Sequence, residues 1–217
     1  GDGVINGAET NVFVADTGAA CIRKIDTAGN VTRVAGGGAT TTCNSTGLAS
    51  AVSLLTPRGI DVDSSGNIYI ADSGRNCVRK VTGTNYSFVA GGGATTTCNA
   101  TGAATAVSLS APNDVEVDST GAVFIVDTGR NCIRKVVGST FSFVLGGGAT
   151  TTCASTGLAT AVALSAPEAI AIDPSGRILV TEATRRCVRA VTGSNYSQVA
   201  LTGTNSRRPR SWQERWV

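Results

Sequence analysis

A segment of about 55 residues recurs four times along the 217-residue chain, and no other feature limits the fold as strongly. The segments ADTGAACIRK, ADSGRNCVRK, VDTGRNCIRK and TEATRRCVRA begin at Ala15, Ala71, Val126 and Thr181, at steps of 56, 55 and 55 residues. A second landmark, GGGATTTC, begins at Gly36, Gly91 and Gly146. A fixed period of this length indicates a repeat architecture, in which each unit packs on its neighbours.

Within each copy, apolar residues alternate with polar ones, which indicates β-strands. In the second copy the alternating segments cover residues 60–63, 67–72, 77–81 and 86–91, separated by the turns SSG, SGRN and TGTN. We therefore expect four short antiparallel strands per copy, then a long loop with a helical turn at residues 103–109. Four-stranded units in series predict the blades of an all-β propeller.

The copies predict one propeller region and a separate tail. We place the propeller at residues 1–203 and the tail at residues 204–217. The four predicted blades cover approximately residues 3–36, 58–91, 113–146 and 168–201. The first copy lacks the proline segment that opens the others, and the fourth never reaches GGGATTTC.

One copy carries a recognisable motif. The run P-x-G-I-x-V-D-x-x-G-N-I-Y-I-A-D-S-G-x-N-x-V-R-K-V, from Pro57 to Val81, resembles the NHL repeat. The following V-A-G-G-G and G-A-A-T-A-V-S-L-S-A-P resemble its long-loop form, which occurs in many secreted and cell-surface proteins. The resemblance covers about residues 3–203 and implies a propeller that usually closes with six blades.

Four copies leave three arrangements open. The chain could close a four-bladed ring, form an arc that segments outside it complete, or form an arc that another molecule completes. Because both ends of the sequence lie within a repeat, we favour an incomplete or partner-completed propeller.

Acids and bases recur at fixed places in the repeat, and we interpret most of them as structural. An acid ends the second strand and an arginine lies in the third strand of every copy: Asp16 and Arg23, Asp72 and Arg79, Asp127 and Arg134, Glu182 and Arg189. We expect each pair to hold the turns of its blade. Asp63, Asp118 and Asp173 precede the turns SSG, STG and PSG, where a carboxylate caps backbone amides.

The first strands line the axis of a propeller, so their polar residues are the natural place for a ligand site. The weak candidates for a calcium site are Asp61, Asn113, Asp114 and Glu116, because Ca²⁺ prefers oxygen ligands. The chain contains no histidine, which excludes His-ligated zinc and Ser-His-Asp or Cys-His catalysis within these residues. We assign no catalytic residue, and calcium is the only cofactor considered.

Two cysteine classes recur with the repeat. Cys21, Cys77, Cys132 and Cys187 open the third strands, and Cys43, Cys98 and Cys153 end the TTTC segments. None forms a C-x-x-C motif, so we predict disulfides. The start of strand three lies beside the end of strand four, which favours pairing within a copy: Cys21–Cys43, Cys77–Cys98 and Cys132–Cys153, with Cys187 left over. Pairing to the next blade would instead give Cys43–Cys77, Cys98–Cys132 and Cys153–Cys187, with Cys21 left over.

Five N-x-S/T sequons fall at two places in the repeat. They are Asn30, Asn85 and Asn195 between strands three and four, and Asn44 and Asn99 just after TTTC. Both places are predicted exposed turns, so we expect N-glycosylation at all five. Sequons together with repeated cysteines predict a secreted protein, extracellular or at the cell surface.

Charge and hydropathy bear on partners. The tail contains four arginines, Arg207, Arg208, Arg210 and Arg215, and one acid, Glu214. It therefore accounts for the whole net charge of +3, so the propeller is neutral. A neutral body argues against nucleic-acid binding. No apolar stretch approaches the roughly 18 to 20 residues of a membrane helix, so we expect no membrane insertion. The expected partners are proteins, either copies of the chain or further blades, and N-linked glycans.

These observations favour a non-enzymatic extracellular propeller that acts as a structural or protein-interaction module in a glycosylated surface or matrix assembly. The alternative is a calcium-dependent propeller hydrolase or lyase with its site on the central axis. The resemblance itself does not decide between them, because propellers serve many functions.

Overall fold

Each repeat forms one antiparallel sheet in the computed structural model, which describes residues 3–6, 11–153 and 155–201. The four inner-to-outer strands are, blade by blade, β1 (Gly3–Asn6), β2 (Asn11–Asp16), β3 (Cys21–Ile25), β4 (Val31–Gly36); β6 (Pro57–Val62), β7 (Ile68–Asp72), β8 (Cys77–Thr82), β9 (Asn85–Gly91); β11 (Pro112–Val117), β12 (Val123–Asp127), β13 (Cys132–Val137), β14 (Thr140–Gly146); β16 (Pro167–Ile172), β17 (Ile178–Glu182), β18 (Cys187–Thr192) and β19 (Asn195–Leu201). The predicted meander of four short strands per copy is confirmed.

Three of the blades carry a fifth, outer strand that periodicity does not predict. The two-residue strands β5 (Gly47–Leu48), β10 (Gly102–Ala103) and β15 (Gly157–Leu158) pair with β9, β14 and β19. Two residues are too few for an alternating pattern to be visible. Each of these strands comes from the loop that leaves the preceding blade, so the loop joins the sheet of the next blade.

Short 3₁₀ helices complete the repeat. They are η1 (Ser73–Arg75), η2 (Ala104–Ala106), η3 (Thr128–Arg130) and η4 (Ala159–Ala161). The helical turn expected at residues 103–109 is present as η2 and is shorter than expected.

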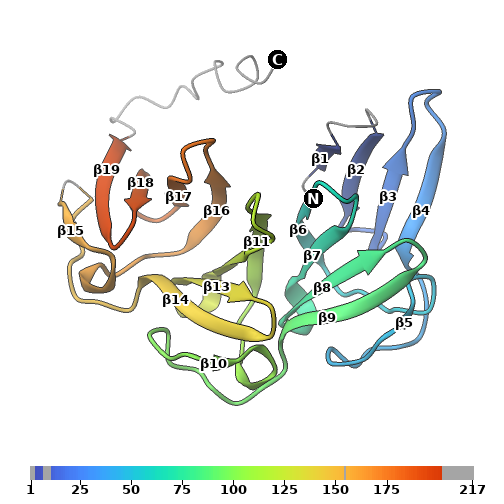
Figure 1. Cartoon of the computed structure of the whole chain (residues 1–217), viewed down its shortest axis with the longest axis horizontal. Helices are drawn as coiled ribbons and strands as arrows, with labels where there is room; N and C mark the ends of the chain where they lie inside the picture. The colour runs from blue at the N-terminus through green and yellow to red at the C-terminus, as the bar shows by residue number, and fades with distance from the viewer. Residues whose placement is uncertain (1–2, 7–10, 154, 202–217) are drawn as a thin grey trace.

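The blades pack face to face in an arc. Figure 1 shows β1, β6, β11 and β16 facing the space that the arc encloses, with the first and fourth blades apart at its open side. Among the described residues, three clusters of buried apolar side chains lie between consecutive blades. In the cluster between the first two blades, Phe13 and Ile22 of the first contact Ile60 and Ile70 of the second. An incomplete propeller is therefore the architecture of this chain.

The GGG of the GGGATTTC segment is needed where the chain leaves one blade for the next. Gly91 ends β9 with a φ of +117°, and a Cβ there would lie 2.5 Å from the carbonyl oxygen of Asn76. Gly146 repeats this geometry at the end of β14. Only glycine combines a left-handed φ with so close an approach of backbone. Beyond it, Gly93 donates to Val107 O and Thr95 to Ala106 O, which folds the loop onto itself.

In the described residues, no helix is long and apolar enough to cross a membrane.

Candidate functional site: the clasp between blades

A buried ion pair occupies the same position in the second, third and fourth blades. Arg79 Nε lies 3.3 Å from Asp72 Oδ2, and Arg134 Nε lies 2.9 Å from Asp127 Oδ2, with all four side chains fully buried. Arg189 pairs with Glu182 in the same way. Each guanidinium also lies over an aromatic ring, that of Tyr86, Phe141 or Tyr196. The expected acid–arginine pairs therefore form in these three blades, and here they lie in the interior.

Each pair binds the loop that arrives from the preceding blade. We call the acid, the arginine and the third-strand cysteine of a blade, together with the loop that they bind, the clasp. Arg134 donates from Nη1 to the carbonyl oxygens of Thr97 and Cys98 at 3.3 and 3.5 Å, and from Nη2 to Thr96 O at 3.4 Å. Asp127 Oδ1 accepts from the amide of Ser110 at 2.8 Å, farther along the same loop. The pair therefore joins two blades rather than only the turns of its own blade, which the sequence did not predict.

Burial decides the protonation behaviour of these acids. Desolvation raises the pKa of Asp127 above its ordinary 3.8, against the opposing effect of hydrogen bonds from Arg134 and Ser110. The pKa of Asp72 is raised for the same reason. In such surroundings the ionised carboxylate is stable only beside its arginine, because an unpaired buried charge is strongly unfavourable.

The disulfides join neighbouring blades, so the predicted pairing within a copy is wrong. The bonds are Cys43–Cys77, Cys98–Cys132 and Cys153–Cys187, each with a sequence separation of 34 residues. Neither Cys21–Cys43, Cys77–Cys98 nor Cys132–Cys153 forms, and Cys21 rather than Cys187 is left over. The reason is the direction of the loop: after Gly91 the TTTC segment crosses to the next blade, where Cys98 Sγ lies 3.2 Å from Arg130 O.

A second contact of the clasp was missed from sequence. Arg75 donates to the carbonyl and hydroxyl oxygens of Ser53 at 2.6 and 2.9 Å, and Arg130 contacts Ser108 in the same way. Asn76, in a left-handed turn, accepts from the amide of Ala111 at 2.7 Å. The sequence feature that could have indicated these contacts is the recurring G-R-N of residues 74–76 and 129–131. By itself this motif predicts only a turn, because its partners lie in neighbouring loops.

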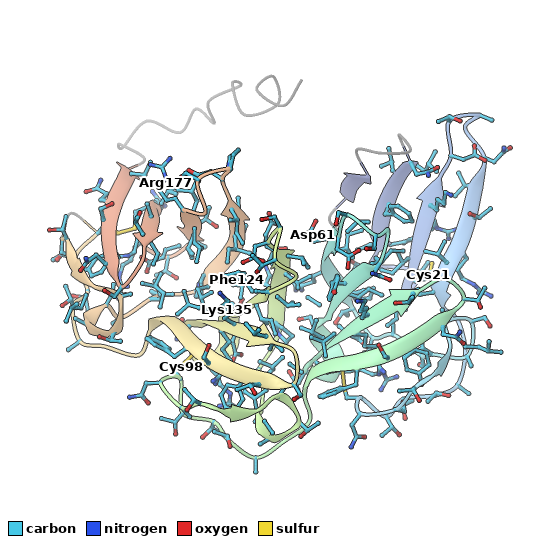
Figure 2. The ribbon with its side chains drawn as sticks, viewed as in Figure 1. Cys21, Asp61, Cys98, Phe124, Lys135 and Arg177 are labelled. Carbon is cyan, nitrogen blue, oxygen red and sulfur yellow. A yellow bond between two sulfur atoms is a disulfide. The ribbon has the colours of Figure 1, made fainter. Side chains whose placement is uncertain are left out.

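Three of the four calcium candidates accept from backbone amides of the next blade, and the fourth, Asn113, contacts both neighbouring blades. Asp61 Oδ2 accepts from Val117 N at 2.7 Å, and Asp114 Oδ2 accepts from Ile170 N at 2.9 Å. Glu116 accepts from Ile172 N at 3.4 Å. Asn113 accepts from Arg58 and donates to Glu168 O, at 3.0 and 2.8 Å. Figure 2 shows Asp61 where the second and third blades meet. The contact between these blades therefore explains why an aspartate stands at this position.

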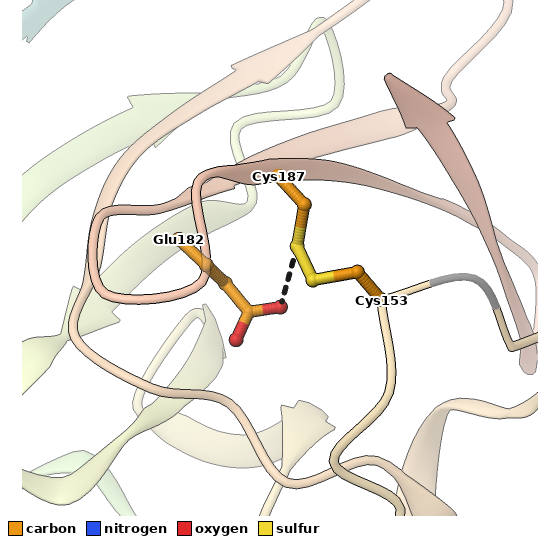
Figure 3. A group of neighbouring side chains, drawn as sticks. All are labelled: Cys153, Glu182 and Cys187. Atoms are coloured by element: carbon orange, nitrogen blue, oxygen red, sulfur yellow. Dashed lines mark hydrogen bonds between the residues drawn. A yellow bond between two sulfur atoms is a disulfide. The ribbon is translucent and has the colours of Figure 1, made fainter. Parts of the chain in front are cut away.

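Among the described residues, the only close group of three metal-ligating residue types is Cys153, Glu182 and Cys187. Figure 3 shows the carboxylate of Glu182 beside the Cys153–Cys187 disulfide. Because disulfide sulfurs are not thiolate ligands, this group is not suited to hold a metal. The three acidic calcium candidates, Asp61, Asp114 and Glu116, do not form such a group in the part of the chain that the structure describes.

The aspartates before the SSG, STG and PSG turns cap them as predicted. Asp63 Oδ1 accepts from the amides of Ser65 and Asn67, and Asp118 Oδ1 accepts from those of Thr120 and Ala122. Asp173 accepts from the hydroxyl and amide of Ser175 and the amide of Arg177. These contacts, led by the Ser175 hydroxyl, lower the pKa of Asp173 from 3.8 to about 2.

The low pKa of Asp173 makes the free energy of unfolding depend on pH, and the direction of this dependence follows from the shift. Because the folded pKa lies below the unfolded value, the contribution is present above about pH 4 and is lost as pH falls through about 2. We expect Ser175→Ala to raise the titration midpoint of Asp173 toward 3.8, as measured by NMR of its carboxyl carbon. Thr120→Ala, the matched change at Asp118, should leave the Asp173 midpoint unchanged. An Asp173 midpoint near 3.8 in the unaltered chain would contradict the assignment.

All five sequon asparagines, Asn30, Asn44, Asn85, Asn99 and Asn195, are exposed. The basic tail at residues 204–217 lies outside the described residues.

With this geometry established, comparison with known proteins identifies the repeat. A family model described as NHL repeat matches residues 54–81, which contain β6, β7 and most of β8. The chain carries an NHL repeat. The other three blades repeat the NHL blade at steps of 55 or 56 residues and have the same strand order. A search of curated protein sequences gives no significant match.

Solved structures share the fold at low sequence identity. Virginiamycin B lyase from Staphylococcus aureus is 13% identical with a TM-score of 0.61, covering 94% of this chain and 56% of that one. A structure described as a nidogen/laminin complex is 17% identical with a TM-score of 0.55, covering 83% and 54%. An auxiliary nutrient binding protein from Bacteroides thetaiotaomicron is 15% identical with a TM-score of 0.65, covering 89% and 47%. The NHL chain spans about half the length of these structures.

Proposed function

We propose that this chain is a non-enzymatic extracellular NHL-type propeller, serving as a structural or protein-interaction module in a glycosylated surface or matrix assembly. The observation that carries the proposal is the use of the repeated polar residues. The recurring carboxylates, arginines and cysteines bind the backbone or the sulfur of a neighbouring blade, which makes them parts of a scaffold. A scaffold stapled by disulfides suits an oxidising compartment.

Two further observations support the extracellular part of the proposal. The five sequon asparagines are exposed, three of them outside the strands and two, Asn85 and Asn195, at the first residue of a strand, so a glycan can be attached at each. One structurally similar chain belongs to a complex described as nidogen with laminin, which is an assembly of proteins. We propose proteins and N-linked glycans as the partners of this chain, with the contacts made by the blades that lack a neighbour.

The test is production of the chain through a eukaryotic secretory pathway. We expect secretion, with glycans at Asn30, Asn44, Asn85, Asn99 and Asn195, detected by mass after enzymatic deglycosylation in heavy-oxygen water. Hydrogen exchange should be faster in β2 and β3 of the first blade than in β12 and β13 of the third, which has a neighbour on each side. A monodisperse monomer by light scattering, with the first blade fully protected and the sequons unoccupied, would contradict the proposal.

The similarity to virginiamycin B lyase keeps a second candidate in view: a calcium-dependent hydrolase or lyase with a site at Asp61, Asn113, Asp114 and Glu116. In this reading the same carboxylates would bind a metal and the next blade's amides together. Calorimetric titration with calcium distinguishes the two. Saturable binding of about one ion per chain, lost in Asp114→Asn, would favour the enzyme, and no saturable binding would favour the scaffold.

A further inference from the structure

The first blade contains the receiving half of the clasp without a loop in it. Asp16, Cys21 and Arg23 stand at the positions that Asp72, Cys77 and Arg79 hold in the second blade. Arg23 Nε lies 2.7 Å from Asp16 Oδ2, so the ion pair is formed. All seven cysteines lie in described residues, and Cys21 is the one without a disulfide.

The face around this pair is uncovered, unlike its equivalents. The side chain of Arg23 is 40% exposed, whereas that of Arg79 is fully buried. Val31 is 56% exposed, whereas Tyr86 at the equivalent position is 3% exposed. An open hollow of about 390 Å³ lies here, and Val14, Asp16, Arg23, Ile25 and Val31 are among the residues that line it.

The other three blades show what fills this place. In the second blade, the loop from the first blade gives the carbonyl oxygens of Thr42 and Cys43 to Arg79 and the sulfur of Cys43 to Cys77. The third and fourth blades receive the next two loops through Arg134 with Cys132, and Arg189 with Cys187. The occupant is therefore the same kind of segment in every case: a threonine-rich loop that ends a blade and presents one cysteine.

We propose that the hollow on the first blade is a docking site for an additional blade of the same repeat, whose TTTC-type loop bonds covalently to Cys21. This deepens the interaction role proposed above, on which it rests, by naming the surface and the kind of partner. A second copy of this chain cannot supply the bond, because its own loop cysteines, Cys43, Cys98 and Cys153, are already paired. The occupant is polypeptide outside these 217 residues.

One sequence difference between the first and second blades limits which parts of the occupant the site can contact. Ala19 replaces the Arg75 that fixes the far end of the arriving loop at Ser53. The site on the first blade therefore recognises the threonine carbonyls and the cysteine, and it makes no side-chain contact like that of Arg75 with the end of the loop.

The bond forms by thiol–disulfide exchange, in which the oxidant is a small disulfide such as oxidised glutathione. The loop thiolate first attacks oxidised glutathione, whose S–S bond breaks, so that a loop–glutathione disulfide forms and one glutathione leaves as a thiolate. The Cys21 thiolate then attacks the loop sulfur, the Cys21–loop bond forms, and glutathione leaves as a thiolate that takes up a proton. Cys21 is buried, so the attack requires the loop to be seated on the blade.

The test uses the full chain and a peptide of residues 91–111, GGGATTTCNATGAATAVSLSA, carrying glutathione on its cysteine. We expect an adduct at Cys21, identified by mass, that forms at least about tenfold faster than with a scrambled peptide of the same composition, because seating raises the local concentration of the disulfide. Cys21→Ser should abolish the adduct. Arg23→Ala should slow it severalfold while leaving the thiol in place.

Equal rates with the native and scrambled peptides would overturn the proposal, as would no adduct when denaturation shows Cys21 to be reduced. A stable dimer of the chain alone, with the first blade protected from exchange, would assign the face to a second copy instead. Either result leaves the secretion and glycan measurements unaffected, so failure here is distinguishable from failure of the proposed function.

Discussion

Arg134→Ala is expected to lower the free energy of unfolding by about 3 to 5 kcal/mol, the usual cost of leaving one partner of a buried ion pair alone. The substitution leaves the Asp127 carboxylate buried without its guanidinium. It also removes the donors to Thr96, Thr97 and Cys98, so the loop from the second blade loses these hydrogen bonds and keeps the Cys98–Cys132 disulfide. Urea denaturation followed by circular dichroism should show a midpoint lower by about 1.5 to 2.5 M, for a slope of about 2 kcal/mol per M.

The first blade provides the matched control for this variant. Arg23→Ala removes the equivalent arginine from a pair whose side chains are 40% and 33% exposed. Solvent screens such a pair, so the expected loss of stability is much smaller than that at position 134. Equal losses at positions 134 and 23 would show that the covering loop adds nothing and would contradict the clasp.

Removing the Cys98–Cys132 bond by the double change Cys98→Ala with Cys132→Ala should cost about 4 kcal/mol. The bond closes a segment with a sequence separation of 34 residues, and the chain-entropy relation gives about this value for such a loop. The loss should be measurable as a lower urea midpoint without reductant. It should largely disappear when both proteins are compared in dithiothreitol, because the unaltered chain then loses the same constraint.

Cys21→Ala is the control, because that cysteine has no disulfide to lose. We expect a cost of about 1 kcal/mol, as for a small buried side chain. A non-reduced tryptic map gives an independent check: residues 131–134 should be joined to residues 81–130, through Cys132 and Cys98. Recovery of Cys132 linked to Cys153 would restore the pairing within a copy and remove the basis of this prediction.

The sequence predicted the blades well because strand alternation and turn residues are local signals. The runs at 67–72 and 77–81 recur as β7 and β8 with nearly the same bounds. The caps at Asp63, Asp118 and Asp173 were predictable for the same reason, since donor and acceptor lie within four residues of each other. The strands β5, β10 and β15 were not, because each is defined by a partner in the following blade.

The cysteine pairing marks the limit of sequence reasoning in this chain. The recurrence of two cysteines per repeat required disulfides, and both connectivities satisfied the spacing. The choice depended on which way a glycine-rich loop turns after Gly91, and glycine places few restrictions on that direction. The direction of the same loop also determines which arginine contacts it. The sequence therefore could not predict that Arg79 and Arg134 join neighbouring blades.

The sequence by itself determined the repeat, the four strands of each blade and the turns that join them, because each depends on residues close together in the chain. Only the tertiary structure decided what joins one blade to the next. The contacts of Arg134 with the loop, the disulfides and the contacts of Asp61 and Asp114 with the next blade all link residues more than 30 positions apart. Their partners are set by how sheets stack face to face, which no local pattern records.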